Sequence, residues 1–191
     1  MIRAALIGLL AAFAACGGPD EAPVANAEGR VITLALWAGS AEALDGPRVS
    51  AHPVTGLSID AYRRRAEGRE QVLTVTQGGA ALGRVLDRQP GMPERRFTGD
   101  AIFPLGLWRQ GESRQFQAQE VTLLGPAERR VTIEILDLGF EYEGVPRSLR
   151  FRVIIRDAAG RPIACETSIY SPGRGLVAFE ASALWRGGAA C

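Results

Sequence analysis

The stretch that decides the fold is LRFRVII, residues 149–155, in which large apolar side chains alternate with arginines. Apolar residues take every second position, and Arg150, Arg152 and the following Arg156 take the positions between or beyond them. Successive side chains of a β-strand point to opposite faces of its sheet. This period of two therefore predicts a strand with one buried face and one face in water.

The neighbouring stretches extend the same pattern in both directions. VTIEI at residues 131–135 alternates in the same way, and the glycine-containing segment 157–161 separates residues 149–155 from the next apolar run. A series of such runs joined by short turns is typical of antiparallel hairpins. The expected order is a strand at 162–170, a turn at 171–175 and a further strand at 176–184.

The first half of the chain has a weaker pattern. Residues 31–37 and 71–77 are expected to be strands, residues 81–87 are a weaker candidate, and IDAYRRRA at 59–66 fits either a strand or a short helix. Residues 39–53 and 88–100 have the composition of loops.

These elements together predict the fold class. We expect a single, mainly β domain over residues 31–185, an antiparallel meander of about eight strands that forms a curved sheet or incomplete barrel, with few short helices. The same number of short strands also fits a sandwich.

The composition excludes some classes of function. The chain is 47% hydrophobic and 23% charged, as an ordinary globular protein is. All 22 basic residues are arginines, and they balance 21 acidic residues to a net charge of +1. Since nucleic-acid binding needs a basic surface, this balance gives no support for it.

The N-terminus is typical of an exported protein. An apolar run of about twelve residues follows Arg3, whereas a membrane-spanning helix needs about twenty. A short run of this kind after one positive charge predicts a signal peptide over residues 1–15.

The sequence FAAC at residues 13–16 resembles the lipobox of bacterial lipoproteins, with Phe13 where leucine is usual. The resemblance implies that Cys16 carries a thioether-linked diacylglycerol and an amide-linked acyl chain such as palmitate, and that residues 16–30 form a flexible tether. Gly17 replaces the aspartate that retains such proteins at the inner membrane, which implies the periplasmic face of the outer membrane. Cleavage after Ala27 would instead release a soluble periplasmic protein.

The residue types that usually carry catalysis are scarce. His52 is the only histidine, and we expect it to be a solvated loop residue and not the centre of a triad. We predict no catalytic, cofactor-binding or metal-binding residues, since metal-ligand spacings and a phosphate-binding loop are lacking. Glu141 and Glu143 are the one carboxylate pair considered for hydrolysis, and we expect them at a solvated edge near Arg150 and Arg152, with cross-strand ion pairs there.

Three cysteines leave one possible intramolecular pair if Cys16 is lipidated. A disulfide between Cys165 and Cys191 would tie the tail, residues 186–191, to the sheet in an oxidising compartment. Two alternatives stay open: a buried free thiol at Cys165, or a bridge between molecules through Cys191.

The C-terminal half carries two further motifs, IFPL at 102–105 and IYSPGRGLV at 169–177. Over residues 101–179 they resemble a group of uncharacterised, β-rich bacterial envelope proteins, although Arg114 and Phe116 stand where an aromatic pair is commoner. The resemblance implies an envelope domain without established catalysis. In the second motif we expect a structural turn built by Tyr170, Pro172, Gly173 and Gly175, with positive φ angles at the glycines.

We therefore expect a non-enzymatic, lipid-anchored envelope protein without cofactors that serves as a binding or assembly module. Its membrane contact would be the N-terminal lipid, and its ligand or partner a lipid, a peptide or another envelope protein. The alternatives are a carboxylate-dependent hydrolase of envelope polymers and a half-barrel carrier of lipids or lipoproteins. A purely structural partner in a larger complex would show an exposed apolar patch and not a pocket.

Overall fold

The computed structural model describes residues 29–37, 39, 43–66, 68–76 and 78–182. The expected signal peptide, Cys16 and the tail at 186–191 lie outside these ranges. Within them the chain forms one short 3-10 helix and twelve strands, in this order: β1 (Arg30–Ile32), η1 (Leu34–Trp37), β2 (Ala43–Ala51), β3 (Ser58–Ala66), β4 (Arg69–Val75), β5 (Ala81–Arg88), β6 (Arg95–Pro104), β7 (Gly106–Trp108), β8 (Ser113–Thr122), β9 (Gly125–Tyr142), β10 (Val145–Arg156), β11 (Pro162–Ser171) and β12 (Gly175–Ser182).

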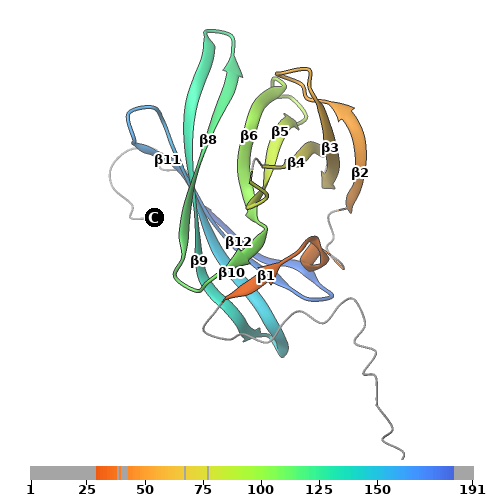
Figure 1. Ribbon diagram of the computed structural model, residues 1–191, viewed down its shortest axis with the longest axis vertical. Coiled ribbons are helices and arrows are strands. Elements are labelled where there is room, and N and C mark those ends of the chain that lie inside the picture. Colours follow the sequence, from red (N-terminus) through yellow and green to blue (C-terminus); the bar gives the residue numbers. More distant parts are fainter. Residues whose placement is uncertain (1–28, 38, 40–42, 67, 77, 183–191) are drawn as a thin grey trace, which may run out of the picture.

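Ten of these strands form one antiparallel sheet in the order β12-β11-β10-β9-β8-β6-β5-β4-β3-β2. Neighbours in the sheet are neighbours in the chain, except that β7 leaves the sheet and pairs with β1. The sheet curves strongly but does not close, since β2 and β12 stand at its two ends (Figure 1). The prediction of a mainly β, antiparallel meander with a curved sheet is confirmed.

The curvature comes from a narrow junction between two halves of the sheet. Strand β6 pairs with β8 only at Arg96 with Val121 and at Phe97 with Glu120. Strand β9 is eighteen residues long and pairs with β8 along its first part and with β10 along its last part. Beyond Phe97, β6 therefore separates from β8, and β2–β6 and β8–β12 face each other across the interior (Figure 1).

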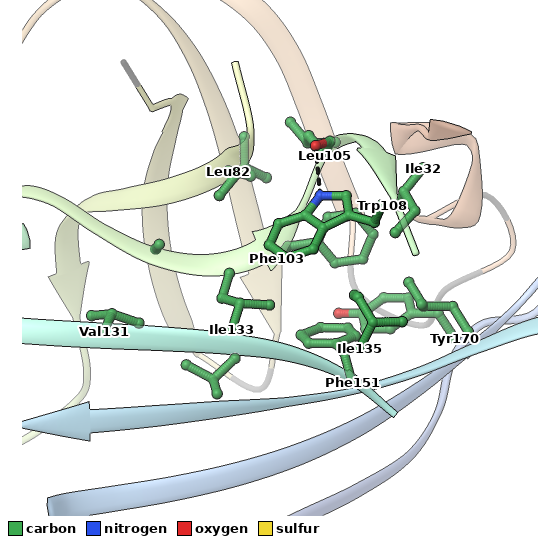
Figure 2. Packing of buried hydrophobic residues seen from close by; sticks show 14 of the residues in the cluster. Ile32, Leu82, Phe103, Leu105, Trp108, Val131, Ile133, Ile135, Phe151 and Tyr170 are labelled. Carbon is green, nitrogen blue, oxygen red and sulfur yellow. Dashed lines mark hydrogen bonds between the residues drawn. The ribbon is translucent and has the colours of Figure 1, made fainter. Parts of the chain in front are cut away.

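Apolar side chains from both halves fill the space between them (Figure 2). Phe103 of β6 lies at the centre, with ring centroids 5.6 Å from Phe151, 5.0 Å from Tyr170 and 5.5 Å from Trp37. Its neighbours Ile133 and Ile135 of β9 are fully buried. Because each aromatic ring buries about 150–250 Å², this cluster supplies much of the hydrophobic stabilisation.

The small β1–β7 ribbon and η1 cover one end of this core. Trp108 of β7 is fully buried, and its indole Nε1 donates a hydrogen bond to the carbonyl oxygen of Leu105 at 2.8 Å (Figure 2). The guanidinium of Arg114 lies over the same indole, 4.1 Å from its centroid. Trp37, the last residue of η1, packs against the core beside this ribbon and is 5% exposed.

Three predictions for the first half of the chain are wrong in part or whole. Residues 31–37 form a short strand and then a 3-10 helix, because Trp37 must turn back into the core. Residues 39–53 contain the strand β2, whose described side chains are almost all exposed because it stands at the sheet's edge. Residues 88–100 contain the start of β6, in which Phe97 and Asp100 are buried.

The other strand predictions are confirmed. Residues 59–66 belong to the strand β3 and not to a helix, and residues 71–77 and 81–87 correspond to β4 and β5. The hairpins predicted after residue 131 correspond to β9–β12. In the part of the chain that the structure describes, no helix is long and apolar enough to cross a membrane.

Candidate functional site

A polar cavity of about 160 Å³ lies between the two halves of the sheet. One wall comes from β3, β4 and β5, which contribute Arg64, Arg69 and Arg84. The opposite wall comes from β11, which contributes Glu166 and Ser168. The remaining lining residues are Trp37, Gln71, Ile102, Tyr170, Leu176 and Phe179.

Among the arginines that line this cavity, Arg84 is the buried one, with 9% of its side chain exposed. Its Nη1 donates to Asp87 Oδ2 at 3.0 Å, its Nη2 donates to Asp100 Oδ2, and its guanidinium lies 4.6 Å from the Phe97 ring centroid. Burial alone would lower the pKa of Arg84, but the carboxylate of Asp100, with further help from Asp87 and Glu166, raises it above the usual value. Arg84 is thus held as a fixed cation.

Asp87 is shared by two arginines. Arg69 Nε and Nη2 donate to its two oxygens at 2.8 and 2.6 Å, in addition to the bond from Arg84. Burial would raise the pKa of Asp87, but the hydrogen bonds from Arg69 and the positive charge of Arg84 lower it. This two-point geometry fixes the plane of the Arg69 guanidinium.

Arg64 completes the positive wall. Arg64 and Gln71 are direct partners in the β3–β4 register, and Arg64 Nη1 donates to Gln71 Oε1 at 3.1 Å. Its guanidinium carbon lies 5.0 Å from the centroid of the Trp37 indole, a cation–π geometry.

Sequence reasoning missed this cluster, because it assigned a strand face only to Arg150, Arg152 and Arg156 and did not single out the arginines at 64, 69 and 84. A signal was present: Arg84 and Asp87 interrupt the apolar strand ALGRVLDR, in which seven of eight residues are buried. Charged residues inside an otherwise apolar strand are rarely buried unless they are paired.

A second feature is the tip of the β8–β9 hairpin. Thr122 pairs with Gly125, so Leu123 and Leu124 form the turn, and both are fully exposed at 105% and 101% of their reference areas. Thr122 Oγ1 donates to the Gly125 carbonyl at 2.6 Å and accepts from the Leu124 N–H at 3.2 Å. Figure 1 shows this hairpin projecting at one end of the long axis.

Arginines on either side hold the base of the hairpin. Glu120 of β8 accepts from Arg95 Nε at 2.6 Å and also from Arg129 Nη2. Burial would raise the pKa of Glu120, but the hydrogen bonds from both arginines lower it. Beside this base, where β6 separates from β8, lies a second cavity of about 320 Å³ with a polar lining that includes Thr98, Gln119 and Arg130.

The prediction that His52 is solvated is wrong. Its side chain is buried in the β2–β3 connection, and its Nδ1 accepts hydrogen bonds from the N–H groups of Val54 and Thr55 at 3.1 and 3.2 Å. The imidazole thus accepts hydrogen bonds from two N–H groups of its own turn.

The carboxylates considered for hydrolysis lie at the β9–β10 turn. Glu141 and Glu143 are both exposed, and Glu143 lies 3.3 Å from Arg174 Nη1. The expected cross-strand ion pairs do form along β9 and β10, but with other acids: Arg150 pairs with Asp137, and Arg152 pairs with Glu134 at 3.7 Å. In the described ranges no three or more potential metal-ligating side chains cluster together.

The cysteine prediction is open. Cys165 is buried in β11. Both Cys16 and Cys191 lie outside the described residues, so the pairing of Cys165 with Cys191 stays a prediction.

The turn between β11 and β12 lies where the motif places it. Gly173 and Gly175 have φ angles of 74° and 68°, and Tyr170 is part of the aromatic core with Phe151. Gly39 lies directly against this turn, since a Cβ atom there would clash with the carbonyl oxygen of Gly173.

Comparisons with known proteins found no relatives. No protein-family model matches the chain, and no curated protein and no solved structure is significantly similar to it.

Proposed function

We propose that this protein is a non-enzymatic, lipid-anchored module of the bacterial cell envelope that assembles with a protein partner through the tip of its β8–β9 hairpin. The lipobox-like sequence at Cys16 supports the anchor, on the periplasmic face of the outer membrane. The observation that carries assembly is the fully exposed pair Leu123–Leu124.

The two leucines are not needed for the turn. Tight turns favour glycine, asparagine, aspartate and proline, and here Gly125 supplies the positive φ of 111° while Thr122 supplies the side-chain hydrogen bonds. Burying one leucine side chain stabilises a protein by about 1.5–3 kcal/mol. The isolated protein gains this stabilisation from neither Leu123 nor Leu124. Residues that do not suit their local structure and are not needed for folding are typical of functional positions.

One further apolar side chain is exposed next to the tip. Val121, which precedes Thr122 and pairs with Arg96 of β6, is 44% exposed. An apolar tip with an arginine base is suited to a partner pocket that is apolar inside and acidic at its rim.

The hairpin tip and strand β1 lie far apart along the molecule, which supports a binding partner on the side that faces away from the anchoring membrane. Strand β1, to which the tether would connect, lies toward the opposite end of the long axis from the hairpin tip (Figure 1). The lipid would thus hold one end of the molecule, and the leucines would point away from it.

The packed interior favours this proposal over the two alternatives. An acyl-chain carrier needs an apolar cavity, whereas aromatic side chains fill the space between the sheet halves and the two cavities described above have polar linings. A two-carboxylate hydrolase needs acids that face each other across a cleft, whereas Glu141 and Glu143 are exposed at a turn.

The anchor is tested by the intact mass of the protein extracted from membranes. The expected mass is that of a chain that begins at Cys16 with diacylglycerol and an amide-linked acyl chain. A mature N-terminus at Glu28 would contradict the lipid anchor.

The assembly surface is tested by a photo-crosslinking amino acid at position 124 in cells that make the protein. We expect one discrete adduct, lost when Leu123 is replaced by serine. Position 57 is the matched control, since Leu57 is 68% exposed on the β2–β3 connection. Absence of an adduct at 124, or the same adducts at both positions, would contradict the proposal.

A further inference from the structure

We propose that the cavity between β3–β5 and β11 is a binding site for a small oxyanion, a carboxylate or phosphate group, held by Arg64 and Arg69 over the buried Arg84. This site is separate from the hairpin tip and adds a ligand to the proposed assembly function.

The charge of the lining points to an anion. Three arginines, Arg64, Arg69 and Arg84, and one acid, Glu166, are among the residues that line the cavity. Asp87 and Asp100 bind these arginines from behind the wall and are not part of the lining. The three arginines are balanced by three acids, Asp87, Asp100 and Glu166, but only Glu166 is among the lining residues. The lining therefore carries more positive than negative charge.

The arginines are oriented before any ligand arrives. Arg69 directs Nε and Nη2 to Asp87, and Arg84 directs both of its Nη atoms to Asp87 and Asp100. Arg64 is held by Gln71 and by the indole of Trp37. Side chains fixed in this way lose little conformational freedom when they bind, which raises the affinity for a ligand.

Stability alone does not explain this cluster. A buried ion pair is often no more stable than apolar residues of similar size, and Leu73 and Leu82 show that β4 and β5 bury apolar side chains fully. Asp100, with no exposed area, has one carboxylate oxygen without a hydrogen-bond partner. An unsatisfied buried oxygen of this kind is costly, so this pairing is not optimised for stability alone.

The size and the opposite wall set the class of ligand. A cavity of about 160 Å³ has room for several water molecules, and so for one oxyanion group. Ser168 offers a hydroxyl beside Glu166. Because Glu166 repels an anion, it weakens binding and disfavours groups with higher charge.

The test is isothermal titration of the folded domain with inorganic phosphate and, separately, with acetate, at constant ionic strength set by sodium chloride. We expect saturable binding of at least one of them. Arg64→Gln removes one guanidinium and should weaken that binding about tenfold, the effect of losing one charge-assisted hydrogen bond. Glu166→Gln should instead strengthen it about threefold or more, because a repelling charge is removed.

Matched controls separate the site from general charge. Arg161→Gln changes the net charge as Arg64→Gln does, but its side chain is 79% exposed in the β10–β11 turn. Glu143→Gln is the equivalent control for Glu166, with 65% of its side chain exposed. Both controls should bind as the unaltered protein does.

Two results would overturn the site: no saturable binding of either anion, or equal losses in Arg64→Gln and Arg161→Gln. Circular dichroism checks that each variant folds. If Arg64→Gln does not fold, Glu166→Gln still decides, since unchanged or weaker binding in that variant contradicts the proposal. Preference for phosphate over acetate, or the reverse, identifies which oxyanion the site takes.

Discussion

Arg69 and Asp87, eighteen residues apart in the chain, form a two-point ion pair on adjacent strands, with N–O distances of 2.8 and 2.6 Å. Asp87 also accepts from the buried Arg84. One carboxylate thus fixes two of the three arginines that line the cavity, and it links the stability of the domain to the geometry of the proposed site.

Replacement of this shared carboxylate should be costly. Asp87→Asn removes the carboxylate that pairs with Arg69 and one of the two that pair with Arg84, which keeps Asp100, in a place where only 5% of the Asp87 side chain is exposed. We expect a loss of about 3 kcal/mol in the free energy of unfolding, measured by urea denaturation at pH 7. A loss below about 0.5 kcal/mol would contradict a structural role of the pair.

The pH dependence of the same pair follows from the lowered pKa of Asp87. The folded-state pKa lies below the ordinary value of 3.8, so the stabilisation is fully present above about pH 5. It is lost as the pH falls below 3.8 and through the folded-state pKa. The difference in unfolding free energy between the unaltered protein and Asp87→Asn should therefore shrink between pH 5 and pH 3, whereas a constant difference would be inconsistent with this linkage.

The aromatic core should be sensitive to truncation at its centre. Phe103→Ala removes the ring that contacts Trp37, Phe151 and Tyr170, and we expect a loss of about 3–5 kcal/mol. Phe179→Ala is the matched control, since Phe179 is 53% exposed, and it should cost less than about 1 kcal/mol. Thermal or urea unfolding of the two variants measures the contrast.

His52 should act through its Nδ1 acceptor and not through its charge. His52→Leu leaves the N–H groups of Val54 and Thr55 without their acceptor, and we expect a loss of about 1–2 kcal/mol. Asparagine offers an oxygen near the position of Nδ1, so His52→Asn should retain most of the stability. Equal losses in the two variants, measured by urea unfolding, would argue against this hydrogen-bonding role.

The exposed leucines should contribute to assembly and not to folding. Leu123→Ser and Leu124→Ser alter fully exposed side chains, so the unfolding free energy should change by no more than about 0.5 kcal/mol. Leu123→Ser should also lose the adduct that forms from a crosslinking residue at position 124. A marked loss of stability in either variant would mean that the leucines pack within the protein itself.

Part of the fold was predictable because its cause is local. The alternation in residues 149–155 is visible within seven residues, and strands β9–β12 follow it. Strand β2 could not be recognised in this way, because an edge strand buries few side chains and so shows no apolar period. Strand β6 could not be recognised for a different reason. Its first six residues contain one buried apolar side chain, Phe97, and one buried acid, Asp100, so they show no regular apolar pattern.

The candidate site was beyond the reach of sequence patterns. Arg64, Arg69 and Arg84 read as surface residues, since a charge is normally left in water. Only Arg84 of the three is buried, whereas Arg64 and Arg69 are partly exposed. The wall that faces them comes from β11, about a hundred residues further along the chain, with Glu166 and Ser168. No pattern within one strand reports such a contact.

The sequence by itself determined that this protein is mainly β, that its second half is a series of hairpins, and where those hairpins turn. These properties depend on side-chain alternation and on glycine and proline, which act over a few residues. Only the tertiary structure decided that Arg84 is buried, that His52 is buried in its turn, and that Leu123 and Leu124 remain exposed. The burial of Arg84 depends on how two halves of a curved sheet pack against each other, because it is set by contacts between strands. The side chains of His52 and of the two leucines depend on the geometry of their own turns, which leaves no apolar period in the sequence.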